Sequence, residues 1–322
     1  MRAVLQRGYG GPEVVEVVDD APEPRAGHDE VVVEIRAAAV DRGTWHLMTG
    51  TPLAVRLALG PRRPRQPVVG RDLAGVVVEV GPDVHGFAVG DEVFGTADGS
   101  LAERTAAKVR RLAPKPAALS FAEAAAVPVS ALTALQALRA GRLREGQRVL
   151  VIGASGGVGS YAVQLAQALG ATEVVGVCSA AKAGFVRSLG AAATIDHRTE
   201  AVDARGTAYD LVLDIAGCRR LRELRALLAP GGSLVLVGGL SGRWLGVRRQ
   251  LLGAALSPFV RQRIPFFVSR EDGRDLAELG DLATKGLLRP AVDATHPLER
   301  VHDALDDLDG GPCGKVVVTV TG

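Results

Sequence analysis

The stretch Val149-Leu150-Val151-Ile152-Gly153-Ala154-Ser155-Gly156-Gly157-Val158-Gly159 decides the fold of this chain. Its first four residues are all apolar, which is typical of a strand buried on both faces of a parallel sheet. The glycine-rich segment follows this strand directly. A helix-forming stretch at 161–169 comes next, and Gly170 ends it. The order of strand, glycine turn and helix predicts the first unit of a nucleotide-binding α/β domain.

The same rhythm continues after this unit. Further strands are expected at 174–178, 194–196, 211–214 and 233–237, with a helix around 185–189 that ends at Gly190. Strands that alternate with helices in this way predict a doubly wound parallel sheet.

The chain on either side of this sheet has a different character. Residues 1–120 contain short strands, such as 31–35 and 75–80, with turn residues between them, which predicts a barrel-like β domain. The Ser120–Glu123 spacing is a capping box that opens a helix. Strands at 289–292 and 315–320 flank one helix and are expected to return to the first domain. The prediction is an α/β chain with a first domain at 1–120, completed by 271–322, and a dinucleotide-binding domain at 121–270.

Composition excludes several classes of protein. The 322 residues are 47% hydrophobic with a net charge of +2, which fits a compact protein and argues against a nucleic-acid surface. The three cysteines form no C-x-x-C pair, which excludes a structural zinc cluster and disfavours a disulfide framework. No apolar run reaches the ~20 residues of a membrane span, and the N-terminus lacks a signal-peptide pattern. We therefore expect a cytoplasmic protein without membrane insertion.

The glycine turn predicts where a dinucleotide binds. A pyrophosphate needs close approach to the backbone and the N–H groups of a helix start, which side chains would obstruct. The spacing is A-x-G-x-x-G, with alanine at the first fingerprint position. The alternative is a tight turn without a ligand, but its place between strand and helix favours a cofactor. The expected contacts are Ala154, Ser155, Gly156, Gly157 and Val158.

The end of the second strand predicts which cofactor binds. An NAD site usually has an acidic residue there for the ribose hydroxyls, whereas this strand runs into Cys178-Ser179-Ala180-Ala181-Lys182. Ser179 can hydrogen-bond a 2′-phosphate and Lys182 can neutralise it, which favours NADPH over NADH. The alternative is that Lys182 is an ordinary solvated residue.

Several segments together resemble a known family. They are 70–77, 81–84, 87–95, 124–128, 133–135, the glycine turn and 314–318. Across nearly the whole chain the sequence resembles the zinc-free medium-chain dehydrogenase/reductases, close to the quinone oxidoreductases. The resemblance implies a GroES-like β-barrel, an inserted Rossmann domain and a C-terminal return. It also implies a small-molecule substrate that meets the nicotinamide between the domains. We expect a homodimer.

Zinc is not expected. Zinc-dependent relatives place a Cys and a His-Glu pair around the metal, and the matching positions here are Asp41 and Arg71-Asp72. Arg71 is cationic, so it cannot ligate zinc. Without a Lewis acid, a conjugated acceptor is the easier substrate, because hydride can add to a quinone or to the β-carbon of an enone. A pathway-specific enoyl or ketone reductase of secondary metabolism and a non-catalytic NADPH-binding protein stay open as alternatives.

The resemblance also assigns candidate site residues. Segment 40–46 resembles the part of the family that lines the substrate cleft. There Asp41 would accept a bond from a ribose hydroxyl, Trp45 would stack on a flat substrate and His46 would donate a proton. Packing is the alternative role for Trp45, and a structural role for His46. Further cofactor contacts are expected at Thr133, His197, Ile215, Ala216, Val237, Gly238, Gly239, Phe266, Phe267, Val268 and Lys315, where strand-end packing is the alternative for the triplets.

Two regions are unusual. Arg56 and the loop 61–67 form a stiff basic segment, which is either a solvated connection or an attractor of anionic substrates. Residues 243–267 are a long apolar excursion for a Rossmann connection. This excursion can cap the substrate pocket, form a dimer interface or touch a membrane, and the first two are favoured.

Overall fold

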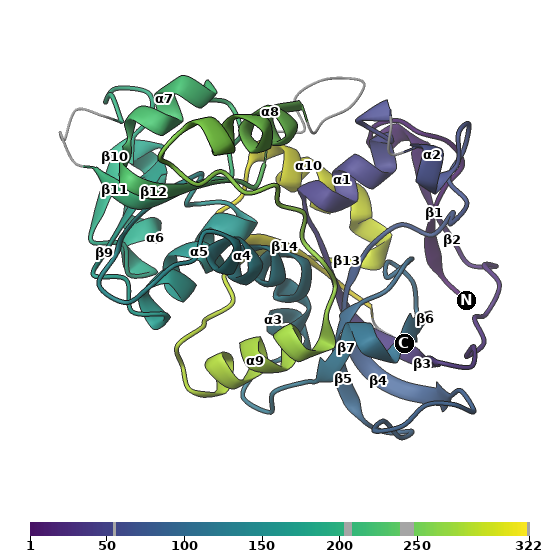
Figure 1. Ribbon diagram of the computed structural model, residues 1–322. Helices are drawn as coiled ribbons and strands as arrows, with labels where there is room; N and C mark the ends of the chain where they lie inside the picture. The colour runs from purple at the N-terminus through teal and green to yellow at the C-terminus, as the bar shows by residue number, and fades with distance from the viewer. Residues whose placement is uncertain (54–55, 203–207, 239–247, 321–322) are drawn as a thin grey trace. The chain divides into compact units, whose positions relative to one another are not determined.

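The computed structural model describes residues 1–53, 56–202, 208–238 and 248–320 (Figure 1). Contacts divide the chain into two compact units. Unit 1 consists of Met1–Leu132 and Glu271–Gly322, and unit 2 is Thr133–Arg270. The first boundary thus lies later than the predicted 120/121.

Unit 1 is built on antiparallel strands around the long strand β3 (Glu30–Val40). The seven-stranded sheet runs in the order β13-β14-β3-β4-β5-β7, and β6 pairs with the first half of β3. A separate hairpin joins β1 to β2. The strands are β1 (Ala3–Gln6), β2 (Val15–Val18), β4 (Asp72–Val80), β5 (Glu92–Thr96), β6 (Arg104–Lys108), β7 (Leu112–Pro114), β13 (Val292–Pro297) and β14 (Lys315–Thr319).

The helices described for unit 1 lie at both ends of the chain. They are α1 (Arg42–Thr49), α2 (Arg56–Leu59), α3 (Phe121–Ala126), α9 (Gly273–Thr284) and α10 (Val301–Gly310), while α4 (Pro128–Ala140) begins there and continues into unit 2. The predicted capping box is confirmed: Ser120 Oγ accepts from Glu123 N, and the Glu123 carboxylate accepts from Ser120 N. Helix α3 packs on β3, β4 and β14, which is why it belongs to unit 1 and not to the nucleotide-binding part.

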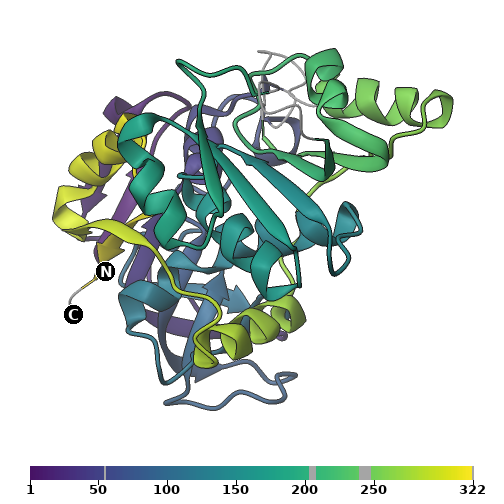
Figure 2. The same cartoon turned by 90° about the vertical axis from the view of Figure 1, so that its left-hand side faces the viewer.

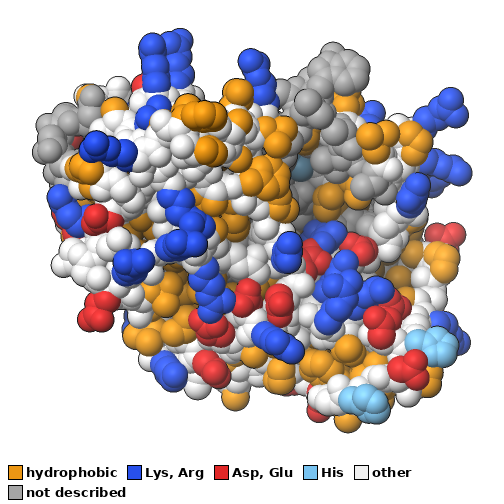
Figure 3. Space-filling view, in the orientation of Figure 1, with side chains coloured by type: hydrophobic (Ala, Val, Ile, Leu, Met, Phe, Trp, Pro, Cys, Tyr) orange, Lys and Arg blue, Asp and Glu red, His pale blue; other side chains and the backbone are white. Residues whose placement is uncertain are grey.

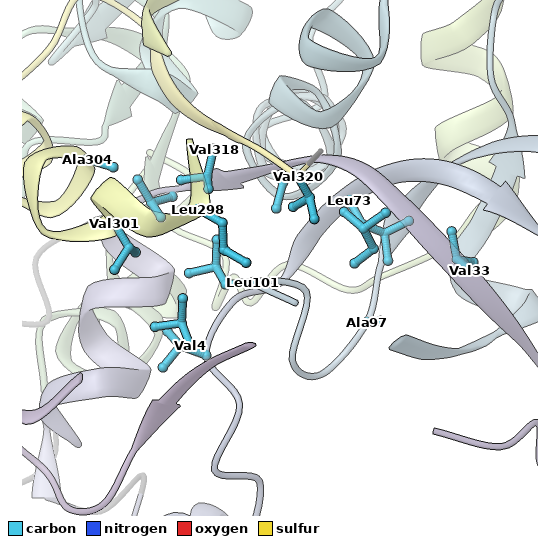
Figure 4. Packing of buried hydrophobic residues seen from close by; sticks show 14 of the residues in the cluster. Val4, Val33, Leu73, Ala97, Leu101, Leu298, Val301, Ala304, Val318 and Val320 are labelled. Atoms are coloured by element: carbon cyan, nitrogen blue, oxygen red, sulfur yellow. The ribbon is translucent and has the colours of Figure 1, made fainter. Parts of the chain in front are cut away.

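The core of unit 1 joins both ends of the chain. Figure 4 shows Val4 and Leu101 near Leu298 and Val301, with Val318 of β14 in the same cluster. Strand β14 pairs with β3, so the C-terminal segment adds a strand to the sheet of unit 1. The strand expected at 289–292 was wrong in position, since β13 begins at Val292. Pro290 lacks an N–H for a ladder, and the parallel pairing with β14 starts only at Val292.

Unit 2 holds the predicted parallel sheet, in the order β10-β9-β8-β11-β12. Figure 2 shows these strands side by side with helices packed against them. The strands are β8 (Arg148–Ile152), β9 (Glu173–Cys178), β10 (Ala193–Asp196), β11 (Tyr209–Asp214) and β12 (Leu228–Leu236), and the helices are α5 (Gly157–Ala168), α6 (Ala183–Ser188), α7 (Leu221–Ala226) and α8 (Arg248–Leu256). The order reverses direction at β8, which confirms the doubly wound fold.

In the part of the chain that the structure describes, no helix has the length and apolarity that crossing a membrane requires.

Two glycines in helices of unit 2 give a matched test of the packing at the glycine turn. A Cβ on Gly159 of α5 would lie 2.1 Å from Gly153 O, whereas a Cβ on Gly184 of α6 would meet nothing within 4 Å. We expect Gly159→Ala to lower the free energy of unfolding by about 1–3 kcal/mol, because helix and turn must separate. Gly184→Ala should raise it by about 0.5–1 kcal/mol through helix propensity. Thermal unfolding measures both, and equal effects would contradict this packing.

Candidate cofactor and substrate site

The carboxyl edge of the sheet in unit 2 is held together by one repeated arrangement. At three places a carbonyl near the end of one strand accepts hydrogen bonds from two successive N–H groups just beyond the end of the neighbouring strand. All six bonds are 3.0 or 3.1 Å long. Val177 O accepts from Gly153 and Ala154, Ile152 O from Ile215 and Ala216, and Asp214 O from Val237 and Gly238. Most of the predicted cofactor residues therefore lie along one edge.

The glycine turn explains why alanine is accepted at its first fingerprint position. The left-handed backbone falls on Gly153, with a φ of +90°, and not on Ala154. Ala154 is fully buried, while the four residues after it are partly exposed. Gly156 caps helix α5 without a side-chain hydrogen bond, so the first N–H groups of the helix stay available to an anion.

The end of β9 carries the residues expected to select the cofactor. Ser179 follows the strand, and Lys182 lies in the short 3₁₀ turn Ala180–Lys182, where Lys182 N donates to Ser179 O. The ring of His197 is fixed at the same place, because its Nδ1 lies 3.0 Å from Cys178 O and must donate to it. Strand β9, which leads to these residues, bonds the glycine turn through Val177 O, and their role toward the cofactor stays a prediction.

Glycine is required where β12 ends. A Cβ on Gly238 would lie 1.7 Å from Ile215 O, so the two strand ends can approach only with glycine there. Gly239 lies outside the described residues. The remaining expected contacts are less closely gathered: Thr133 is half-buried on α4, Phe266 and Val268 are exposed, and Phe267 is partly exposed. Their role toward the cofactor stays a prediction.

In unit 1 the structure brings Asp41 and Lys315 together in one buried cluster. The Lys315 ammonium is buried and donates to Asp41 Oδ2 at 3.1 Å, Asp72 Oδ2 at 2.7 Å and Ser130 Oγ at 3.3 Å. These three acceptors all lie inside unit 1, and the role of Lys315 toward a cofactor stays a prediction. Asp41 Oδ1 accepts from the Thr44 N–H at 2.9 Å and caps helix α1, and its role toward a ribose stays a prediction.

The cluster contains two carboxylates and only one ammonium, and the pKa values of all three groups are shifted. Burial raises the pKa of Asp72 to about 6, the ammonium opposes this rise and the Asp41 carboxylate adds to it. Burial also favours the neutral form of Asp41, but the ammonium and the Thr44 N–H outweigh it and hold the pKa of Asp41 below its usual value. Burial lowers the pKa of Lys315, and the two carboxylates more than reverse this. One ammonium neutralises one carboxylate, so Asp72 is the carboxylate that takes up a proton first as the pH falls.

Trp45 and His46 lie on helix α1. Trp45 is half-buried, packs on the core of unit 1 and carries the Arg42 guanidinium 5.8 Å from its ring centre, and its role toward a substrate stays a prediction. His46 is also half-buried. Among the described residues its Nδ1 has no hydrogen-bond partner. Burial lowers the pKa of His46, so its ring is neutral at pH 7.

Arg71, at a position where zinc-dependent relatives have histidine, belongs to a ring of four charges. Its guanidinium pairs with Asp98 at 2.7 Å and with Glu271, and Arg111 pairs with the same two carboxylates at 3.2 and 3.0 Å. This ring fastens the returning segment at Glu271 onto the β strands. No group of three or more potential metal ligands occurs within the described ranges of the chain.

The structure shows the contacts and exposure of the basic segment, Arg56 with loop 61–67, and of the described part of the apolar excursion 243–267. Arg56 stacks on Tyr9 at 4.3 Å and donates to the carbonyls of Thr49 and Gly50, so it holds the loop together. The loop 60–65 lines an open pocket of about 820 Å³ with Arg7. Figure 3 shows basic side chains among acidic and apolar ones on the visible face. In the apolar excursion, Leu251, Leu252 and Phe259 are exposed, while Trp244 and Leu245 lie outside the described residues.

Comparison with known proteins identifies the family. A model of the alcohol dehydrogenase GroES-like domain matches residues 27–194, and one of a zinc-binding dehydrogenase matches 189–318. The 2-methylene-furan-3-one reductase of Solanum lycopersicum is 33% identical over 99% of this chain and 79% of its own length. The chain belongs to the medium-chain dehydrogenase/reductase family. Within this family it is quinone-oxidoreductase-like, which confirms the resemblance.

Two further relatives bear on the activity. The NADPH-dependent alkenal/one oxidoreductase of Arabidopsis thaliana is 32% identical over 99% of this chain and 79% of its own length. The Escherichia coli quinone oxidoreductase solved with NADPH superposes with a TM-score of 0.84 at 27% identity, covering 99% of this chain and 100% of that one. This member of the family is an oxidoreductase with NAD(P)H as its cofactor.

The buried charge cluster was missed from the sequence alone. Lys315 begins strand β14, whose other residues are uncharged, and Asp72 begins the buried first half of β4, so each charge stands at the edge of a buried stretch. That pattern could have suggested that the two charges pair, because lone buried charges are rare.

The surplus charge of this cluster predicts a pH dependence of stability. Since the folded-state pKa of Asp72 is about 6 and its ordinary value is 3.8, its contribution is favourable below pH 4 and is lost as the pH rises toward 6. Asp72→Asn imitates the protonated side chain, so this variant should match the natural protein near pH 4. Near pH 7 it should exceed the natural protein by up to roughly 3 kcal/mol in the free energy of unfolding. Chemical unfolding at both pH values measures the difference, and a gap that narrows toward pH 7 would disprove the assignment.

Proposed function

We propose that this protein is an NADPH-dependent, zinc-independent reductase of quinones or α,β-unsaturated carbonyl compounds. The observation that carries the proposal is the carboxyl edge of the sheet in unit 2. There the glycine turn, the uncapped start of α5 and the acid-free end of β9 come together. The names of the relatives, an alkenal/one oxidoreductase and quinone oxidoreductases, support this substrate class.

NADPH is favoured over NADH because of the charges at the end of β9. No carboxylate stands at Ser179, and Lys182 three residues later carries a positive charge. A 2′-phosphate would find a hydroxyl and an ammonium there, whereas an acidic residue would repel it. The adjacent His197 ring is already bonded to Cys178 O, so it offers a flat surface at a fixed place.

Zinc independence rests on the chemistry of the residues at the family's metal positions. Asp41 is engaged by Lys315 and by Thr44, and Arg71 is engaged by Asp98 and Glu271. A divalent cation would have to displace an ammonium and lie beside a guanidinium, which Coulomb repulsion opposes. The name of the family model that matches 189–318 describes the family and does not supply the ligands that this chain lacks.

Bound NADPH supplies the hydride, and the chain supplies binding and orientation. The uncapped N–H groups of α5 bind the pyrophosphate, and the strand-end segments at 215–216 and 237–238 line the rest of the cofactor. His46 is the proposed proton donor through its protonated form, which burial makes the minor form at pH 7, and Trp45 is the proposed surface for a flat substrate. A homodimer and a cytoplasmic location are parts of the same proposal.

The selectivity for NADPH has a direct test. We expect Lys182→Ala to weaken NADPH binding about tenfold, equivalent to about 1.4 kcal/mol, and NADH binding by less than about twofold, because only NADPH carries the 2′-phosphate. Fluorescence titration of the two reduced cofactors measures this. Arg187→Ala is the matched control, since Arg187 lies on the neighbouring helix α6, outside the 3₁₀ turn that holds Lys182. Equal losses for NADPH and NADH would remove the proposed role of Lys182.

Oxidation of NADPH in the presence of quinones, alkenals, cyclic enones and enoyl thioesters tests the reaction. We expect turnover with conjugated acceptors and none with the corresponding saturated ketones, because only the conjugated system spreads the charge that hydride addition creates. Preference for enoyl thioesters would favour the pathway-specific reductase. Tight NADPH binding without turnover on any acceptor would favour a binding protein instead.

A further inference from the structure

The side chain of Arg249 joins helix α8 to the end of β11. One guanidinium nitrogen donates to Gly217 O at 2.7 Å, and the other donates to Arg219 O at 2.7 Å and to Asp214 Oδ2 at 2.5 Å. The side chain of Arg249 is only 17% exposed. Its planar fork of donors thus holds both ends of the segment 214–219 at once, which a point charge on a flexible stem could not do.

The carboxylate at the other side of this contact is fully buried. Asp214 ends β11 and has no exposed surface. Its Oδ1 accepts from the Gly217 N–H at 3.1 Å, and its Oδ2 takes the bond from Arg249. A buried carboxylate is tolerated only with a counter-charge and hydrogen bonds, so Asp214 depends on Arg249.

The clamped segment lies against the glycine turn. Between Asp214 and Gly217, which Arg249 holds, the N–H groups of Ile215 and Ala216 both donate to the carbonyl of Ile152, the residue that leads into the turn. An ideal Cβ on Gly153 would be 3.1 Å from Ala216 N, so turn and segment are in close contact. A shift of 215–217 would therefore displace the backbone of the glycine turn, where the pyrophosphate is proposed to bind.

We propose that Arg249 is a positioning residue for the cofactor site: it fixes 215–217 against the glycine turn and makes cofactor affinity depend on helix α8. The inference rests on the proposed binding of NADPH at this edge. It gives the described end of the apolar excursion a function besides capping a pocket or forming an interface, because this excursion carries the guanidinium that orders the strand end (Figure 1).

Fluorescence titration with NADPH, together with thermal unfolding of the protein without cofactor, tests this role. We expect Arg249→Met to raise the Kd for NADPH about tenfold or more at a temperature where the variant is folded. Arg249→Lys keeps the charge but not the fork, and should give an intermediate Kd. Arg248→Met is the matched control, because Arg248 is the exposed neighbour on the same helix, and it should bind as the natural protein does.

A second variant separates positioning from stability. Asp214→Asn combined with Arg249→Met removes the unpaired buried charge, while the amide oxygen of the new side chain can still accept from the Gly217 N–H. The unfolding temperature should therefore recover toward that of the natural protein. The Kd should stay raised, because the bonds to the carbonyls of Gly217 and Arg219 are still missing.

The outcomes distinguish this inference from the proposed function. Recovery of both quantities in the double variant, or a Kd for Arg249→Met equal to that of the natural protein, would overturn the positioning role alone. A natural protein without measurable affinity for NADPH would overturn the proposed function and this inference with it.

Discussion

The buried ammonium of Lys315 is the contact on which the rest of unit 1 depends. It joins four parts of the chain: the start of β14, the cap of α1 at Asp41, the start of β4 at Asp72 and the start of α4 at Ser130. Asp72 also accepts from the Val129 N–H at 2.7 Å, so the same cluster fixes where α4 begins. A salt bridge buried this deeply is weak evidence for stability, but it strongly disfavours any arrangement that separates its members. The cluster therefore specifies how the C-terminal segment completes the first unit.

In both units a buried carboxylate pairs with a cation from a distant part of the chain. In unit 1 a cation from the returning segment pairs with carboxylates at the starts of other elements. In unit 2 a cation from the apolar excursion, Arg249, pairs with the buried carboxylate that ends β11. In both cases the partners are far apart in sequence, and the contact sets the position of backbone near a candidate site. Arg71 and Glu271 repeat the pattern with two partly exposed side chains, for which water screens the charges more than it does for the buried carboxylates.

What could be predicted from the sequence follows from periodicity and glycine. The apolar run at 149–152, the stops at Gly170 and Gly190 and the capping box at Ser120 are local signals, and each was found where the sequence placed it. The three-dimensional pairing of Lys315 and of Asp214 is not local, because a sequence does not show which distant charge a buried residue meets. For the same reason the resemblance to the family assigned Asp41 and Lys315 to ligands, while the structure bonds them to each other. The fold was thus predictable, whereas the pairing of the buried charges was not.

The central claim is that this member of the family transfers hydride without a metal, with a guanidinium at one of the metal-ligand positions and carboxylates bonded to the Lys315 ammonium at the others. Elemental analysis of the purified protein, combined with NADPH oxidation by the same sample on an enone or quinone after dialysis against a chelator, tests it most directly. The account predicts far less than one zinc ion per chain and undiminished turnover after dialysis. A stoichiometric zinc ion whose removal abolishes turnover, and whose return restores it, would contradict the account.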